Sequence, residues 1–163
     1  MSSINKLNLF LAAVVALLAV LFFLPEEHVY TPLTNIKAND ISSITISSKH
    51  RKLVFNKIDQ QWTLQTTPEK TIEAKTITKL LGILKTHSHR QFENTANNRL
   101  AFELNNPVYR IEIDSLHIEF GITDPVEELR YILLNNKIHL INDTYLQFLL
   151  ADESFFYAKV DAK

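Results

Sequence analysis

The sequence contains no cysteine and only two glycines, Gly82 and Gly121, among its 163 residues. The absence of cysteine excludes disulfides, thiolate metal sites and a cysteine nucleophile. The scarcity of glycine argues against a nucleotide-binding protein, because loops that cradle phosphates need several glycines for close backbone approach. We therefore expect no nucleotide or other cofactor.

An excess of charge of one sign is also missing. The chain has 17 Lys and Arg residues against 18 Asp and Glu residues, and its formal net charge is −1 with six His residues counted as neutral. A nucleic-acid-binding surface normally concentrates Lys and Arg, whereas the two signs are interspersed throughout this sequence. We expect no nucleic-acid partner.

One long hydrophobic run is present at Leu7–Leu24, and it is apolar throughout except for Asn8. Its length is close to that needed to cross a hydrocarbon core of about 30 Å, and it lacks the polar stripe of a helix in a globular protein. A cleaved signal peptide would end in small residues, whereas this run ends in Phe22-Phe23-Leu24-Pro25. The run therefore predicts an uncleaved N-terminal transmembrane helix.

Charges on either side of this run predict its orientation. Lys6 precedes it, and Glu26 and Glu27 follow it. Because basic flanks stay in the cytoplasm, the rest of the chain is expected outside. This divides the chain into a cytoplasmic stub and transmembrane anchor at 1–24, a tether at 25–39, and an extracytoplasmic domain at 40–163.

Short runs in which apolar and polar residues alternate predict two series of antiparallel strands with one buried face. The first series comprises Ile41–Ser48, Lys52–Lys57 and Gln61–Gln65, and the second comprises Tyr109–Ile113, Leu116–Phe120, Leu129–Leu134 and Lys137–Ile141. The clearest turn is Asn135-Asn136, because asparagine tolerates the positive φ of a tight hairpin.

Helical spacing follows each series of strands. In Ala74–Thr86, four apolar residues recur at i, i+3, i+4 and i+7, namely Ile77, Leu80, Leu81 and Leu84. Thr144–Leu150 predicts a second, shorter helix, and Phe155–Val160 predicts a closing strand or extended tail. The expected fold class is α+β, with an antiparallel β-rich domain built from two meander-plus-helix halves behind the transmembrane helix.

Two histidines, His87 and His89, are the candidates for metal binding. In an extended segment, residues i and i+2 share a face, and neutral imidazoles there could bind zinc or copper, with Glu93 supplying a carboxylate if the chain turns. No third ligand is convincingly spaced, and the simpler interpretation is that both histidines are exposed. We therefore predict no metal site.

Acid–base chemistry has two candidate positions. His117 and Glu119 share the face opposite the apolar residues of their predicted strand, and His139 lies opposite Ile138 and Leu140 in another strand. Such residues more often form the solvated face of a sheet. No Gly-x-Ser-x-Gly nucleophile motif and no acidic calcium-binding loop is present. We expect no catalytic residues and no enzymatic activity.

A series of short motifs covers nearly all of the predicted extracytoplasmic part. They are Ile44-Thr45-Ile46, Leu53-Val54-Phe55, Trp62-Thr63-Leu64, Pro68, Leu80-Leu81 with Leu84, Leu104-Asn105-Asn106-Pro107, Tyr109-Arg110-Ile111, Ile118-Glu119-Phe120-Gly121 and Arg130-Tyr131-Ile132. This series resembles the DUF4340 domain, a bacterial family of unknown function. The resemblance implies an envelope protein of the bacterial inner membrane with a periplasmic domain, associated with transport systems, and it brings no catalytic residues.

These observations lead to one hypothesis and one alternative. The hypothesis is a membrane-anchored periplasmic protein that binds another membrane protein, as a non-catalytic accessory subunit of a complex. The alternative is a metal-binding or hydrolytic envelope protein that uses its histidines. A further possibility is that the Leu7–Leu24 helix itself docks within a larger complex.

Overall fold

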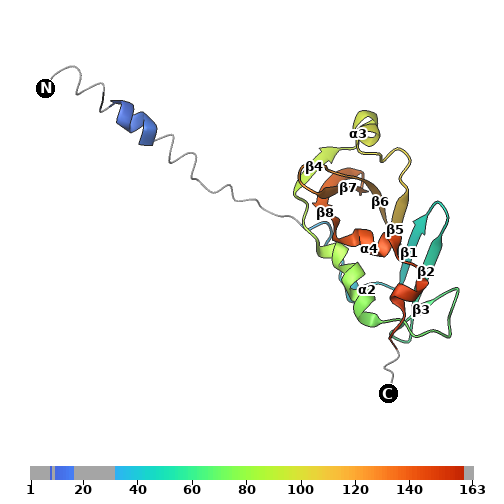
Figure 1. The fold of residues 1–163 in the computed structure, drawn as a ribbon. Helices are drawn as coiled ribbons and strands as arrows, with labels where there is room; N and C mark the ends of the chain where they lie inside the picture. The colour runs from blue at the N-terminus through green and yellow to red at the C-terminus, as the bar shows by residue number, and fades with distance from the viewer. Residues whose placement is uncertain (1–7, 9, 17–31, 160–163) are drawn as a thin grey trace.

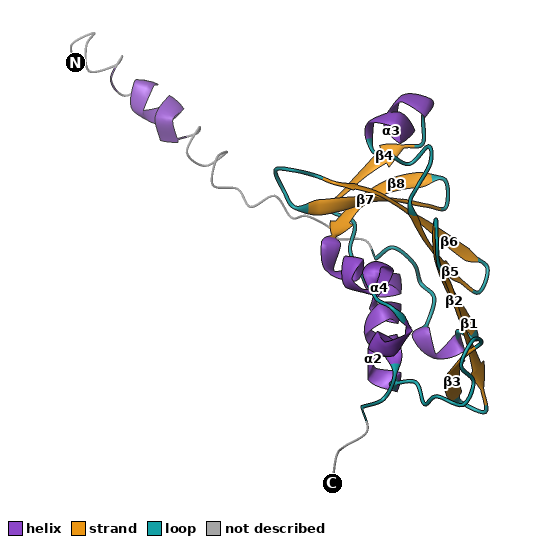
Figure 2. Cartoon of the chain, turned by 45° about the vertical axis from the view of Figure 1, so that its right-hand side comes forward, coloured by secondary structure: helices purple, strands orange, loops and turns teal. Residues whose placement is uncertain are grey.

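A computed structural model describes residues 8, 10–16 and 32–159 of the chain. Residues 32–159 contain one antiparallel sheet of eight strands in the order β3-β2-β1-β5-β6-β7-β8-β4 (Figures 1 and 2). The strands are β1 (Ser43–Ser48), β2 (Lys52–Ile58), β3 (Gln61–Leu64), β4 (Arg90–Glu93), β5 (Tyr109–Ile113), β6 (Leu116–Thr123), β7 (Leu129–Leu134) and β8 (Lys137–Asn142).

The helices of this part are short. The α-helices are α2 (Ala74–Leu81), α3 (Ala96–Ala101) and α4 (Leu146–Leu150), and the 3-10 helices are η1 (Ala38–Asp40), η2 (Gly82–Lys85), η3 (Asp143–Tyr145) and η4 (Glu153–Phe156). Figure 2 shows α2 and α4 on the same side of the sheet, with α3 near β4 at the far end.

Two tight hairpins fix the register of neighbouring strands. Asn135 and Asn136 join β7 to β8 with φ values of 49° and 62°, and Asp59 and Gln60 join β2 to β3 with φ values of 48° and 67°. Two consecutive residues with positive φ form the turn whose twist matches that of paired strands. The predicted turn at Asn135-Asn136 is confirmed.

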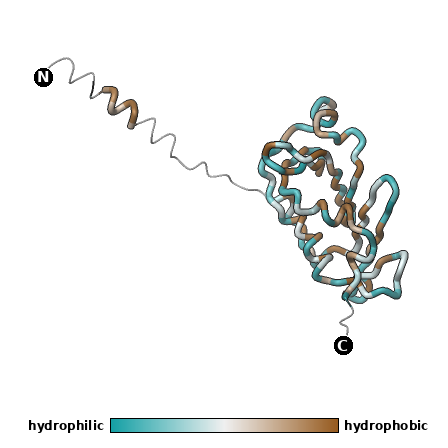
Figure 3. The backbone as a smooth tube through the Cα atoms, in the orientation of Figure 1, coloured by the Kyte–Doolittle hydropathy of each residue, from teal (hydrophilic) through white to brown (hydrophobic). Residues whose placement is uncertain are grey.

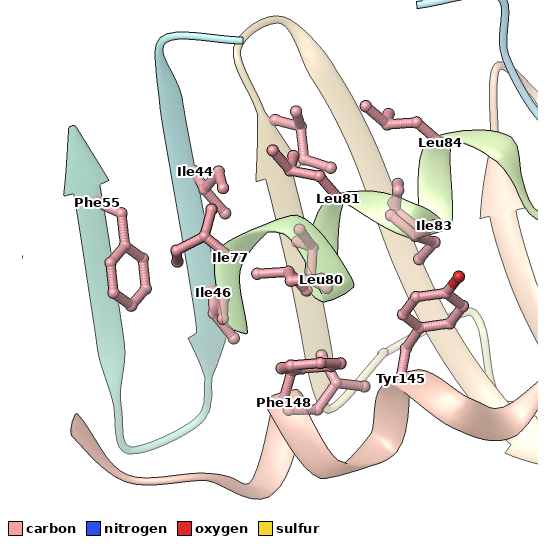
Figure 4. Close-up of a cluster of buried hydrophobic side chains, with 14 of the residues drawn as sticks. Ile44, Ile46, Phe55, Ile77, Leu80, Leu81, Ile83, Leu84, Tyr145 and Phe148 are labelled. Atoms are coloured by element: carbon pink, nitrogen blue, oxygen red, sulfur yellow. The ribbon is translucent and has the colours of Figure 1, made fainter. Parts of the chain in front are cut away.

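The larger hydrophobic core lies between α2, α4 and one face of the sheet. The predicted apolar face of α2 is confirmed, since Ile77, Leu80, Leu81 and Leu84 are all buried. Figure 4 shows Ile77 and Leu80 pointing toward the strands of the sheet, and Figure 3 shows hydrophilic residues gathered in the outer loops. The helical segment ends as α-helix at Leu81 and continues to Lys85 as the 3-10 helix η2.

A second, smaller core lies on the opposite face, at the β7–β8–β4 end. Successive side chains of a strand point to opposite faces, so Ile132 joins the first core while Tyr131 joins the second. Phe102 stacks on Tyr131 with ring centroids 3.9 Å apart, and Phe92 packs against both rings. Both faces of the sheet are therefore covered at this end.

The predicted fold class is wrong in two respects. The two expected halves form one continuous sheet, because β1 pairs with β5 in the register Ile44↔Ile113. In addition, no helix in the described part of the chain is long and apolar enough to cross a membrane.

The predicted span at Leu7–Leu24 lies mostly outside the described residues. The prediction of a transmembrane signal anchor is contradicted, because no helix among the described residues is long and apolar enough to cross a membrane.

Three shorter segments also differ from expectation. β4 and α3 have no predicted counterpart. In the segment predicted as a closing strand or extended tail, Phe155 and Phe156 end the 3-10 helix η4, Tyr157 is extended and forms an isolated bridge with Ile72, and Val160 lies outside the described residues. Part of the expected tether packs on the domain, since Leu33 is buried and its N–H donates to the Thr86 carbonyl at 2.9 Å.

Candidate functional site

The histidines predicted as metal candidates do not gather into a ligand set. His87 and His89 are exposed on either side of Ser88, whose hydroxyl lies 3.1 Å from Nδ1 of His139. Glu93 lies 3.7 Å from the ammonium of Lys137 instead of approaching the histidines. Among the residues that the structure describes, no three His, Asp or Glu side chains are placed to hold a metal ion together.

The predicted pair of His117 and Glu119 is not formed. Residues directly opposite each other on paired strands are close neighbours, and the register places Glu112 opposite His117. The His117 Nδ1 lies 3.7 Å from the Glu112 carboxylate, while Glu119 accepts from Arg99 at 3.3 Å and from Arg110 at 3.4 Å. Glu119 and the two arginines form partly exposed ion pairs on this face of the sheet.

His139 does not lie on a solvated face, contrary to the sequence interpretation, because it is only 8% exposed. The cause is the position of β8 between β7 and β4, where both faces of the sheet are covered. Burial, together with the positive charge of Lys137, lowers the pKa of His139 below its usual value, although a backbone hydrogen bond at Leu134 opposes that shift.

The lowered pKa of His139 predicts a loss of stability in mild acid. The unfolded chain takes up the proton first, near the ordinary histidine pKa of about 6.5, so the stabilisation is present above that pH and is lost as the pH falls below it. The limiting slope for one proton is about 1.4 kcal/mol per pH unit. We expect the free energy of unfolding, measured with urea, to decrease less between pH 8 and pH 5 in His139→Gln than in the wild type. An equal decrease for both proteins, with exposed His117→Gln as control, would refute this assignment.

The two edges of the sheet differ in charge. Edge strand β4 carries exposed Arg90 and Glu93, which pair with Glu127 and Lys137 respectively. Charged side chains on an edge strand discourage pairing with another chain. The β4 edge is therefore protected by its own sequence.

Edge strand β3, Gln61–Leu64, carries no charged residue, and within the described residues it pairs with β2 alone. In a two-residue hairpin the closing pair, Ile58 and Gln61, is hydrogen-bonded, and such pairs then alternate along the strand. The next bonded positions are Thr63 and Gln65, which agrees with the 2.9 Å bond from the Gln65 N–H to the Val54 carbonyl. The N–H and carbonyl of Trp62 consequently point away from β2, whereas Leu64 is fully buried.

A cleft of about 420 Å³ borders this free edge. One wall is the hairpin segment from Gln60 to Thr63, and the other is the loop from Pro68 to Ile72 together with Ala74. The half-buried Trp62 packs against the larger core, and Ile58 at the end of β2 is 57% exposed. The cleft therefore has both the outward backbone groups and the half-buried indole of Trp62 at its border.

Contacts with the C-terminal segment hold the loop wall in place. The Thr71 carbonyl accepts from the Ala158 N–H at 2.9 Å, and the Glu73 N–H donates to the Phe156 carbonyl at 2.8 Å. The Thr67 and Tyr157 hydroxyls lie 3.0 Å apart. The cleft is thus bounded by two walls that are each fixed by backbone hydrogen bonds.

The sequence analysis identified no site at β3. The alternation of Gln61–Leu64 predicts a strand, but not its position at the edge of the sheet. No local feature of the sequence marks β3 as an edge strand, because that position depends on the strand order. Comparison of the chain with protein-family models, with curated proteins and with solved structures gives no match. The resemblance to the DUF4340 domain stays a prediction, and the function is argued from the site.

Proposed function

We propose that this protein is a non-catalytic protein-binding module that takes up an extended segment of its partner at the free edge of β3. The observation that carries the proposal is the outward N–H and carbonyl of Trp62, which lie beside a cleft on an uncharged edge strand. Strand addition draws its affinity from such main-chain groups and its specificity from pockets for alternate side chains.

The surroundings of β3 favour a partner segment of alternating character. An added strand lies about 4.8 Å from its neighbour, and every second side chain would face Trp62. Buried aromatic residues are frequent anchors of protein interfaces. The cleft lining contains one residue of each charge, Glu69 and Lys70, so binding should depend weakly on salt.

The other parts of the hypothesis have different support. The histidine-based alternative is not favoured by any geometry, because His87, His117 and His139 belong to separate local arrangements. A role as an accessory subunit and a location outside the cytoplasm rest on the sequence and the family resemblance alone.

A matched pair of substitutions at Trp62 tests the proposal. Both Trp62→Pro and Trp62→Val remove the indole, but only proline also removes the outward N–H, and proline is tolerated on an edge strand where that N–H faces solvent. Octapeptides selected from a random library on the immobilised wild-type protein serve as the probe, with affinities measured by calorimetry. We expect Trp62→Pro to bind them at least about tenfold more weakly than Trp62→Val, the equivalent of one hydrogen bond.

Thermal unfolding of both variants provides the control for folding. Equal affinities of the two folded variants, or affinities equal to that of the wild type in both, would contradict strand addition at β3.

A further inference from the structure

A second hollow, of about 450 Å³, lies between the segment that enters the domain and the end of η2. Its lining comprises Pro32, Thr34, Asn35, Ile36, Lys37, Lys85 and His87. Backbone hydrogen bonds join its two walls, because the Leu33 N–H donates to the Thr86 carbonyl at 2.9 Å and the Thr34 N–H donates to the Leu84 carbonyl at 3.2 Å. The Thr34 hydroxyl donates to the Leu84 carbonyl as well, at 3.0 Å.

The described residues that line this hollow include a lysine on each wall. Lys37 stands on one wall and Lys85 stands on the other, and no acidic residue is among the described lining residues. The cleft at β3 and the hollow beside Glu119 each include an acidic residue. The two lysines of this hollow contrast with the net charge of −1 for the whole chain.

We propose that the hollow binds a phosphate group, either free or carried on a lipid headgroup. Lysine binds phosphate as a compact point charge with three donors, and two lysines on opposite walls can approach one anion from both sides. The hydrogen bonds between the walls hold the two cationic segments together before the anion arrives. The proposal is independent of the β3 edge and of any partner bound there.

The test uses inorganic phosphate as the probe in an NMR titration of the full chain. We expect saturable shifts of the amides of residues 34–37 and 85–87, and a dissociation constant raised about fivefold by Lys37→Gln and by Lys85→Gln. Lys49→Gln, an exposed lysine in the β1–β2 turn, is the matched control and should leave the dissociation constant unchanged.

Flotation with phosphatidylglycerol vesicles, against phosphatidylcholine vesicles, separates the two sources of phosphate. Binding to the anionic vesicles alone, lost in Lys37→Gln and Lys85→Gln, would identify a lipid headgroup, whereas saturable binding of inorganic phosphate identifies the free anion. The absence of both, or equal weakening by Lys49→Gln, would overturn the proposal.

Discussion

The Gly121→Ala variant is expected to lose about 3 kcal/mol of unfolding free energy, a large part of the stability of an ordinary domain. A Cβ atom at Gly121 would lie 2.1 Å from the Phe102 carbonyl oxygen and 3.1 Å from the Leu104 side chain. That oxygen belongs to the backbone and accepts from the Ile122 N–H at 3.1 Å, so it cannot move away cheaply. Urea unfolding followed by circular dichroism measures the loss.

The other glycine of the chain is a matched control for this prediction. A Cβ atom at Gly82 would meet only the Tyr145 hydroxyl, at an ordinary 3.5 Å, and the residue has helical backbone angles. Gly82→Ala should therefore stabilise the protein by about 0.5–1 kcal/mol through helix propensity. Similar changes in unfolding free energy for the two substitutions would contradict the close approach of the Phe102 carbonyl to Gly121.

The Arg130→Met variant is expected to lose about 3 kcal/mol, because it leaves a nearly buried carboxylate without its cation. The Arg130 side chain is 12% exposed and that of Asp143 is 17% exposed, and two guanidinium nitrogens donate to this carboxylate at 2.6 and 2.9 Å. The same guanidinium donates to the Gly121 carbonyl at 2.6 Å and to the Thr123 hydroxyl at 2.7 Å. It thus holds β6 and β7 together where their register shifts.

Two controls distinguish the loss of the Arg130–Asp143 contact from the loss of a positive charge: a substitution in a surface ion pair and a double-mutant cycle. Arg90 pairs with Glu127 at side-chain exposures of 55% and 39%, so Arg90→Met should cost less than about 1 kcal/mol. Combining Arg130→Met with Asp143→Asn should cost at least about 1 kcal/mol less than the sum of the two single changes. An additive cycle would contradict the coupling of Arg130 to Asp143.

Much of the local structure could be predicted because the spacing of hydrophobic residues along the sequence indicates strands and helices directly. The alternation in Lys52–Lys57 and Lys137–Ile141 and the spacing of Ile77, Leu80 and Leu84 correspond to β2, β8 and α2. These patterns depend only on which side of an element faces the core.

The order of strands in the sheet depends on contacts distant in sequence, and local patterns do not contain it. β4 is a four-residue polar strand that exists because β8 supplies its partner, so no period marks Arg90–Glu93 as a strand. The burial of His139 follows from that same pairing. The ion pair between Arg130 and Asp143 likewise lies beside the register shift between β6 and β7, which the sequence does not reveal.

The candidate site was missed for a related reason. Trp62 and Thr63 alternate like any half-buried strand, and only the strand order shows that β3 has a free side. The opposite wall of the cleft is a loop whose position is set by the C-terminal segment, as in the pairing of Ile72 with Tyr157. Both walls are therefore products of the tertiary fold.

Amide hydrogen exchange of Trp62 and Thr63, measured by NMR with and without a selected octapeptide, tests the central claim most directly. In the free protein we expect the Trp62 amide to exchange much faster than the Thr63 amide, which bonds to β2. With the peptide at about ten times its dissociation constant, exchange at Trp62 should slow roughly tenfold while Thr63 changes little. Unchanged exchange at Trp62 with the peptide bound would contradict strand addition at this edge.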